Sequence, residues 1–149
     1  KQLEEHTITR RYHALCFGRL KEESGTISAP IGRDEKDRKR QAINYKHGKE
    51  AVTHYKLLES FENASLVECR LETGRTHQIR VHMKSIGHPL IGDPVYGLKK
   101  CPYSIQGQAL HAMVLGFIHP QSGEYMEFSA DYPDDFLRVL TSLRNKSRK

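Results

Sequence analysis

Apolar and polar side chains alternate in two neighbouring segments, residues 51–58 and 65–71, and this alternation restricts the fold more than any other feature of the sequence. A period of two is that of a β-strand, whose successive side chains point to opposite faces. Glu62 and Asn63 lie in the short link between the segments, and so short a link joins antiparallel neighbours. The chain is therefore expected to contain an antiparallel β-sheet.

Further runs have the length and composition of strands, and turn-rich connections link them. They cover residues 11–17, 26–29, 110–118 and 125–130. Because a parallel pair of strands needs a long crossover, the short connections favour antiparallel pairing. No internal repeat and no linker divides the chain. We therefore predict a single domain with an α+β fold, in which a few helices flank a largely antiparallel mixed sheet.

Helical spacing is found in one segment near the middle of the chain. Ile79, Met83 and Ile86 repeat at helical steps, Gly87 is placed as a left-handed cap, and a proline follows. The pattern predicts a helix of about three turns over residues 76–86.

The two ends and one long excursion complete the expected architecture. Residues 1–9 are predicted to end a helix, and residues 30–48 to form a charged surface loop. A closing helix is expected after Asp134, which could cap it, because Phe136 and Leu140 begin a helical apolar pattern.

Composition limits the classes of protein to which the chain can belong. Its 149 residues allow one sizeable core, and no apolar run approaches the ~20 residues that cross a bilayer. Its three cysteines are widely spaced, which favours reduced thiols and a cytoplasmic location. A formal charge of +6 and a pI near 9.3 favour a polyanionic partner.

The predicted middle helix carries a cationic stripe as well as an apolar one. His77, Arg80 and Lys84 share a face opposite Ile79 and Met83. A Gly-rich turn precedes the helix, so free backbone N–H groups and the positive end of the helix dipole meet there. These features indicate a site that faces an anion. The alternative is an ordinary amphipathic helix whose polar face is solvated.

Residues 71–97, LETGRTHQIRVHMKSIGHPLIGDPVYG, resemble the long motif of the RluA-type RNA pseudouridine synthases almost position for position. Residues 11–18, RYHALCFG, are similar to the strand that carries the active-site tyrosine of that family. Residues 108–124 are similar to its C-terminal strands. The resemblance therefore spans essentially the whole chain. It implies the pseudouridine synthase catalytic fold and isomerisation of uridine to pseudouridine in RNA, with no cofactor and no metal.

The resemblance also implies roles for particular residues. Arg80 would pair with the catalytic aspartate, and Tyr12 would stack on the flipped-out target base and assist removal of the proton from carbon 5. Leu110 would pack under the pocket. At the helix start, Arg75, His77 and Gln78 are candidates for contacts with the RNA backbone. Large-subunit ribosomal RNA is the expected substrate, and transfer RNA is the other substrate of the family.

One part of the family pattern does not occur in residues 1–149, namely the His-Arg-Leu-Asp motif that holds the nucleophile. We therefore expect the chain to be the C-terminal portion of one catalytic domain, inactive alone, with an exposed sheet edge that favours dimerisation. Without that partner, Arg80 is expected to turn toward solvent, a bound anion or a neighbouring acidic group. Asp93 is expected to cap or form a turn. The alternative function is an RNA-binding module without catalysis.

Other candidate sites have simpler explanations. The histidines do not share a helix face at metal-ligand spacing, and no cysteine pair accompanies them, so no metal site is expected. Because no apolar run is long enough to cross a bilayer, no membrane contact is expected. His111 and His119 flank a predicted strand and are interpreted as ordinary hydrogen-bonded histidines. Cys69 lies in an apolar strand pattern, which indicates a core thiol.

Overall fold

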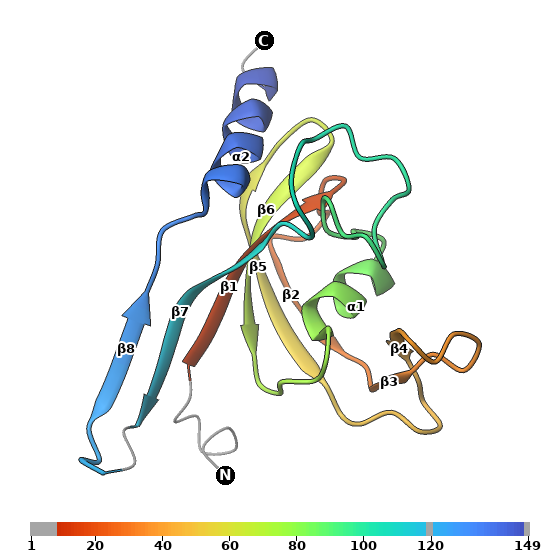
Figure 1. Cartoon of the computed structure of the whole chain (residues 1–149), viewed down its shortest axis with the longest axis vertical. Helices are drawn as coiled ribbons and strands as arrows, with labels where there is room; N and C mark the ends of the chain where they lie inside the picture. Colours follow the sequence, from red (N-terminus) through yellow and green to blue (C-terminus); the bar gives the residue numbers. More distant parts are fainter. Residues whose placement is uncertain (1–8, 119–120, 148–149) are drawn as a thin grey trace.

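The computed structural model describes residues 9–118 and 121–147, which form eight strands and two helices (Figure 1). In chain order these are β1 (Thr9–Phe17), β2 (Ser24–Ser28), β3 (Ile31–Arg33), β4 (Gln41–Ile43), β5 (Val52–Ser60), β6 (Ala64–Leu71), α1 (Gln78–Ser85), β7 (Leu110–Ile118), β8 (Tyr125–Ser129) and α2 (Asp134–Ser147). Apart from Thr9, the helix end expected over residues 1–9 lies outside the described residues, and so does His119.

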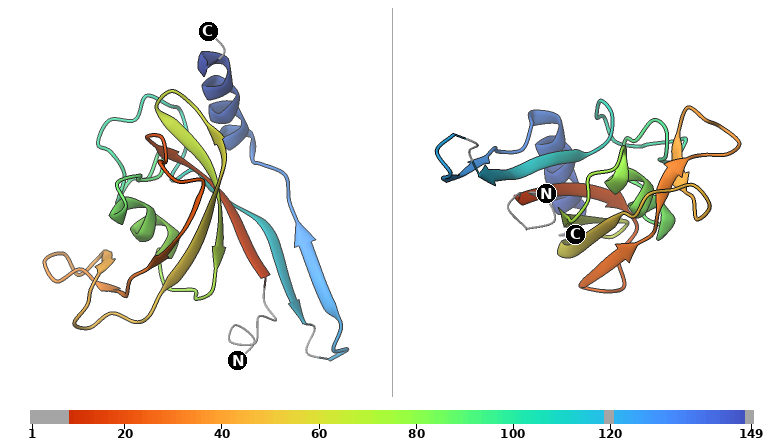
Figure 2. Two further views of the ribbon diagram at one scale, coloured as in Figure 1. Left: turned by 180° about the vertical axis from the view of Figure 1, so that it is seen from behind. Right: turned by 90° about the horizontal axis from the view of Figure 1, so that it is seen from below.

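Six strands form the main sheet in the order β2-β5-β6-β1-β7-β8, and every pair in it is antiparallel. β1 lies inside the sheet between β6 and β7, and the outer hairpin of β7 and β8 extends away from the rest of the fold (Figures 1 and 2). The predicted α+β class with a largely antiparallel sheet is confirmed. The sheet is antiparallel because tight connections link β5 to β6 and β7 to β8.

The two helices pack on opposite faces of this sheet. Val67 and Cys69 of β6 are buried with Ile79 and Met83 of α1, so the face that carries these odd-numbered β6 residues is called the α1 face. The neighbouring Leu66 points the other way, because side chains alternate along a strand, and it is buried in a cluster with α2. That second face is called the α2 face.

Helix α1 is shorter than the sequence indicated and begins at Gln78 instead of near Thr76. His77 occupies the N-cap position with φ 56°, a left-handed conformation that is uncommon for a residue with a side chain. The chain therefore enters the helix through a sharp turn at His77. The predicted left-handed glycine after the helix is confirmed at Gly87, with φ 87°.

Residues 30–48 are not a simple surface loop, because β3 and β4 form a two-stranded sheet within them, beside α1 (Figure 1). Ile31 of β3 is buried in a small cluster with Val81 of α1 and Tyr96. Asn44 closes the segment: its Oδ1 accepts hydrogen bonds from two backbone N–H groups, and its Nδ2 donates to the carbonyl of Arg33. The β3–β4 hairpin is thus fixed against the helix by an apolar contact and by side-chain hydrogen bonds.

The closing helix α2 is confirmed, although Asp134 is its first residue and not a residue before it. Phe136 and Leu140 are buried against Leu15 and Leu66 of the sheet, and the Phe136 ring stacks on Tyr132 at 4.7 Å between centroids. Neither helix is long and apolar enough to cross a membrane, considering only the residues that the structure describes.

Candidate active site

Arg80 lies on α1 and is only 8% exposed, although it carries a charge. Its Nε donates to Oδ2 of Asp93 and its Nη2 donates to Oδ1, both at 2.9 Å. The side chain of Asp93 is completely buried. The two residues therefore form a bidentate ion pair, the arrangement in which arginine binds a carboxylate most firmly. Of the three orientations expected for Arg80, the one toward a neighbouring acidic group is observed.

The turn after α1 holds the Asp93 carboxylate in place. Its Oδ1 also accepts hydrogen bonds from the backbone N–H groups of Val95, at 2.9 Å, and Tyr96, at 3.0 Å, which confirms the predicted turn role. Burial acts to raise the pKa of Asp93, but the hydrogen bonds from Arg80 and these two amides outweigh it, so the pKa lies below its ordinary value. The Asp93 carboxylate in turn raises the pKa of Arg80. Both partners are therefore charged.

Tyr96 connects this ion pair to the β3–β4 hairpin. Its ring is 5.0 Å from the guanidinium carbon of Arg80 and 5.0 Å from that of Arg40, so two cations contact one ring. Its hydroxyl accepts a hydrogen bond from the Gln41 N–H and lies 2.8 Å from Nδ1 of His77. Tyr96 was not predicted from the sequence, where its only signal is its place in the motif.

His77 is held as a neutral imidazole at the start of α1. Burial and the nearby Arg80 cation lower its pKa, and the more weakly felt Asp93 carboxylate acts in the opposite direction. The Tyr96 hydroxyl can donate to Nδ1 while it accepts from the backbone, an arrangement that leaves the imidazole proton on Nε2. His77 then offers one N–H donor beside the Arg80 guanidinium.

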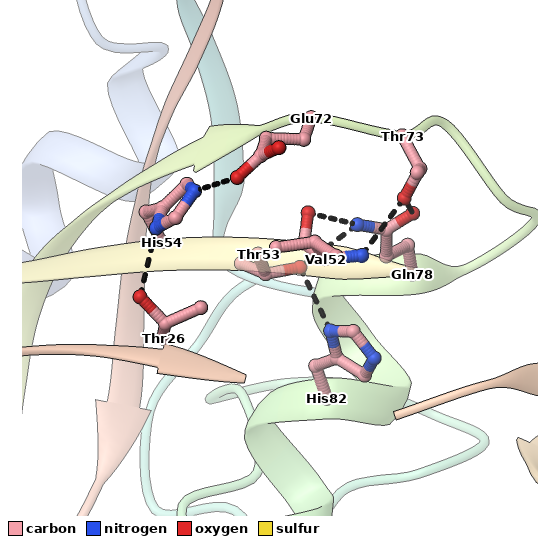
Figure 3. A network of polar contacts seen from close by, with 8 residues as sticks. All are labelled: Thr26, Val52, Thr53, His54, Glu72, Thr73, Gln78 and His82. Atoms are coloured by element: carbon pink, nitrogen blue, oxygen red, sulfur yellow. Dashed lines mark hydrogen bonds and ion pairs between the residues drawn. The ribbon is translucent and has the colours of Figure 1, made fainter. Parts of the chain in front are cut away.

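Gln78 lies inside the protein, with 2% of its surface exposed, and its amide is fully engaged (Figure 3). Its Oε1 accepts hydrogen bonds from the Thr73 hydroxyl at 2.8 Å and the Arg75 N–H at 2.9 Å. Its Nε2 donates to the Val52 carbonyl at 3.0 Å and to the Thr53 hydroxyl at 2.9 Å. Gln78 therefore ties the start of α1 to β5 and to the turn after β6.

His82 extends this network one turn further along α1 (Figure 3). It is completely buried; its Nδ1 lies 2.8 Å from the Thr53 hydroxyl, and its Nε2 lies 2.9 Å from the carbonyl of Ala29. Burial lowers the pKa of His82, and the hydrogen bond to Ala29 opposes this only in part. A neutral ring that donates from Nε2 and accepts at Nδ1 satisfies both contacts.

Tyr12 and Leu110 lie on the α1 face, half-buried against the same apolar cluster as Ile79. Tyr12 is on β1 between Cys69 of β6 and Ala112 of β7, next to a β-bulge in the pairing with β7. The structure therefore brings Arg80, Tyr12 and Leu110 to one face of the sheet. Arg75 lies in the turn before α1, where its Nε donates to the Glu50 carbonyl at 2.7 Å.

Sequence reasoning also missed Arg10, which lies two residues before Tyr12. A Cβ atom at Gly74 would collide with the Arg10 guanidinium, so this glycine allows the cation to lie against the turn that precedes α1. The Nε of Arg10 is buried and has no hydrogen-bond partner among the described residues. A pattern of charges could not reveal this contact, because it joins two segments that are far apart in sequence.

The other candidate groups have structural roles. Cys16 and Cys69 are buried free thiols, and burial raises the pKa of each to about 12, so the core-thiol interpretation of Cys69 is confirmed. The Nε2 of His111 lies 3.2 Å from the Ala130 carbonyl and donates to it, as in an ordinary hydrogen-bonded histidine. Within residues 9–118 and 121–147, no three His, Cys, Asp or Glu side chains gather as metal ligands do.

The fold and this site define an α+β protein in which a buried ion pair fixes a cation on one face of an antiparallel sheet, the face that also carries a half-buried tyrosine. Residues 1–85 match the family model described as RNA pseudouridylate synthase. The chain belongs to the RNA pseudouridylate synthase family.

Relatives and solved structures agree with this assignment. The chain is 55% identical over 143 residues to the uncharacterized RNA pseudouridine synthase YlyB of Bacillus subtilis, a match that covers 96% of the chain and 46% of the relative. It is 48% identical over 156 residues to ribosomal large subunit pseudouridine synthase D of Zymomonas mobilis, covering 97% of the chain and 49% of the relative. The chain thus spans about half the length of these curated relatives.

The solved structure of human RNA Pseudouridylate Synthase Domain Containing 1 is also similar, with a TM-score of 0.76 and 27% identity. The match covers 96% of this chain and 68% of the human one. The resemblance to pseudouridine synthases stated from the sequence is therefore confirmed.

Proposed function

We propose that this protein converts uridine to pseudouridine in RNA, with large-subunit ribosomal RNA as its substrate. The observation that carries the proposal is the buried Arg80, held charged in the matched motif and on the same sheet face as Tyr12 and Leu110. The names of the relatives support the choice of RNA: that of the Zymomonas mobilis protein specifies the large ribosomal subunit. Transfer RNA is the alternative substrate.

The role proposed for Arg80 is to hold and orient a nucleophilic aspartate. Asp93 engages Nε and Nη2 of Arg80, and no described residue hydrogen-bonds to Nη1. A guanidinium fixed along one edge can still present the Nη1 donors to a second carboxylate. Asp93 would then act as the group that aims Arg80, and the nucleophile would come from outside residues 1–149. On this proposal the chain forms the C-terminal portion of a single catalytic domain and is inactive alone.

The remaining site residues receive roles that follow from their contacts. The nucleophile would bond to the uridine, the glycosidic carbon–nitrogen bond would break, and the detached base would rotate. Carbon 5 would then bond to the ribose, the bond to the nucleophile would break, and the proton would leave carbon 5. Tyr12 would stack on the base and assist loss of that proton, and Leu110 would line the pocket beneath it. His77 and Arg75 would contact the RNA backbone, whereas Gln78, whose amide is fully engaged, would position α1 for them.

The proposal is tested by measuring tritium release from C5-labelled uridine in ribosomal and transfer RNA. The assay uses the full-length protein that the gene encodes. Release is expected with ribosomal RNA, and Arg80→Ala should lower kcat on the order of 100-fold to 1,000-fold because a preorganised charge is removed. Tyr12→Phe should lower kcat by roughly 100-fold or more if the hydroxyl assists proton transfer. Arg138→Ala removes an exposed arginine of α2 and serves as the matched control.

The outcome that contradicts the proposal is absence of tritium release from both RNA classes by a folded preparation. Activity that survives Arg80→Ala unchanged would contradict the role of Arg80 in particular. Turnover by residues 1–149 alone would contradict the external origin of the nucleophile.

A second candidate function is an RNA-binding module without catalysis, which the formal charge of +6 favours. In that case the chain by itself would bind RNA with an affinity that falls steeply as salt is raised. Absence of binding at low ionic strength would rule the module out.

Two further expectations are proposals as well. The edge strands of the described sheet, β2 and β8, could pair with a second copy and give a dimer. Light scattering of the chain at high concentration tests this, and a monomer would contradict it. The reduced cysteines favour a cytoplasmic location, which a fluorescent fusion in cells would test.

A further inference from the structure

A cleft of about 500 Å³ lies on the sheet in a place that the proposed active site does not use. Its lining comes from β1, β2, β5 and β6 and includes Arg11, Thr26, His54, Lys56, Glu68 and Arg70. The neighbours of Arg70 along β6, Cys69 and Leu71, belong to the cluster under α1. Because side chains alternate along a strand, Arg70 points to the α2 face, beyond the part that α2 covers.

The centre of this cleft is a pair of like charges. Arg11 of β1 and Arg70 of β6 are direct partners in the strand register, and both are exposed. Neither side chain has a hydrogen bond or an ion pair among the described residues. Like charges directly opposite each other destabilise an antiparallel sheet. An anion bound between the two guanidinium groups would offset this repulsion.

The two carboxylates that lie beside Arg70 on this face, Glu68 of β6 and Glu72 just after the strand, are turned to other partners. Glu72 is bonded to Nε2 of His54, whose Nδ1 lies 2.8 Å from the Thr26 hydroxyl (Figure 3). Glu68 lies 3.1 Å from Nε2 of His13, on the next strand. Glu72 holds His54, which is the direct β5 partner of Arg70, and Glu68 holds His13, two residues beyond Arg11 on β1. They leave Arg11 and Arg70 to face the cleft.

The groups that line the cleft are of the kinds that bind phosphate. Arg11, Arg70 and Lys56 offer cationic donors, and Lys56 is also exposed. They lie on three adjacent strands: Arg11 and Arg70 face each other in one row, and Lys56 lies in the next row, opposite Glu68. Guanidinium groups match phosphate oxygens in pairs, and such contacts depend on the backbone of a nucleic acid and not on its sequence.

We propose that this cleft binds backbone phosphates of RNA, as a second contact surface on the sheet face opposite Arg80. The choice of RNA rests on the proposed function. A structured RNA that reached both faces would pass around the edge strand β2, the outer strand on the side of the sheet where the cleft lies. The cleft would add affinity without adding sequence preference.

The test is a salt titration of binding between the gene-encoded protein and a structured ribosomal RNA fragment. The logarithm of the association constant falls linearly with the logarithm of salt concentration. The magnitude of this slope decreases by about 0.7 to 0.9 for each phosphate that the protein no longer neutralises. We expect a decrease of that size for Arg70→Ala and a further one for the double variant Arg11→Ala/Arg70→Ala. The matched control is Lys99→Ala/Lys100→Ala, which removes the same charge from exposed residues outside the cleft. Its slope should remain steeper than that of the double arginine variant.

The outcomes separate this inference from the proposed function. A slope in Arg11→Ala/Arg70→Ala equal to that of the wild type overturns the second surface, whatever the tritium assay shows. A slope decrease no larger than in the lysine control also overturns it, because general electrostatic attraction would then explain the effect. A protein that releases no tritium, but whose salt slope decreases in the arginine variants, supports the second surface and contradicts the proposed reaction.

Discussion

Replacement of Asp93 by alanine should be among the most destabilising single substitutions in this chain. The carboxylate is completely buried and accepts four hydrogen bonds: two from Arg80 and one each from the N–H groups of Val95 and Tyr96. Asp93→Ala removes all of them at once. It leaves the Arg80 guanidinium, 8% exposed, without a counter-charge.

The size of the effect follows from the groups left without a partner. Breaking a buried ion pair by removing one partner costs about 3 to 5 kcal/mol, chiefly because the other charge stays buried. Two unsatisfied N–H groups add to this, at roughly 1 to 3 kcal/mol each where water cannot reach them. Because domains of this size have about 5 to 15 kcal/mol of stability, Asp93→Ala should remove a large part of it. Asp93→Asn should cost less, since an amide oxygen can still accept from the turn.

The measurement is urea unfolding of the 149-residue chain, followed by circular dichroism, for the wild type and Asp93→Ala. The pair of Arg144 with Glu59 is the internal control, because these side chains are 40% and 36% exposed. Glu59→Ala should lower the free energy of unfolding by only about 0.2 to 1 kcal/mol. An effect of Asp93→Ala as small as that of Glu59→Ala would refute the reasoning.

The pH dependence gives a second check on the same residue. The pKa of Asp93 in the folded chain is lower than its ordinary value, so the unfolded chain binds the proton more readily. The stabilisation is therefore fully present above the ordinary pKa of aspartate and is lost as the pH falls through the lower folded value. Asp93→Asn should remove this part of the acid sensitivity.

Further predictions concern residues outside the ion pair. Burial lowers the pKa of His82, so its contribution to stability is fully present above the ordinary histidine pKa and is lost as the pH falls through the lower folded value. The free energy of unfolding should therefore drop on acidification below the ordinary histidine pKa, and by less in His82→Gln. Cys101, which is only partly buried, should react with a thiol reagent in the folded chain, whereas Cys16 and Cys69 should react only after unfolding. Tyr96→Phe keeps the ring but removes the hydroxyl, and should lower stability by about 1 to 3 kcal/mol and increase amide hydrogen exchange in β4.

The strands of the main sheet and both helices could be predicted from the sequence because each has a local signal. Alternation placed β5 and β6, and the spacing of Ile79 and Met83 placed α1. The β3–β4 hairpin was missed because its strands have three residues each and no alternation to detect. It is held by tertiary contacts, the Asn44 side chain and the Tyr96 hydroxyl, which no local pattern reveals.

For the site, the sequence likewise predicted which residues take part but not their contacts or burial. The motif identified Arg80 and the turn at Asp93, but not that these two residues bind each other. The helix face that the sequence presents as uniformly cationic is divided in the structure, with Lys84 exposed and Arg80 buried. Gln78 is polar in sequence and yet enclosed. Spacing along a helix gives the direction of a side chain, whereas its burial depends on the segments that pack against it.

The Arg80–Asp93 pair is better explained by orientation than by stability. Removing two charges from water is costly, and apolar residues of similar volume often replace a buried ion pair with little loss of stability. We therefore expect the double variant Arg80→Met/Asp93→Leu to be more stable than Asp93→Ala, since neither charge is left unpaired. The same variant of the gene-encoded protein should release no tritium from labelled RNA, because the guanidinium is gone. A double variant as unstable as Asp93→Ala would show that the pair maintains the fold itself. Stability regained without activity would show instead that the fold does not need the pair, whereas the reaction needs the Arg80 guanidinium.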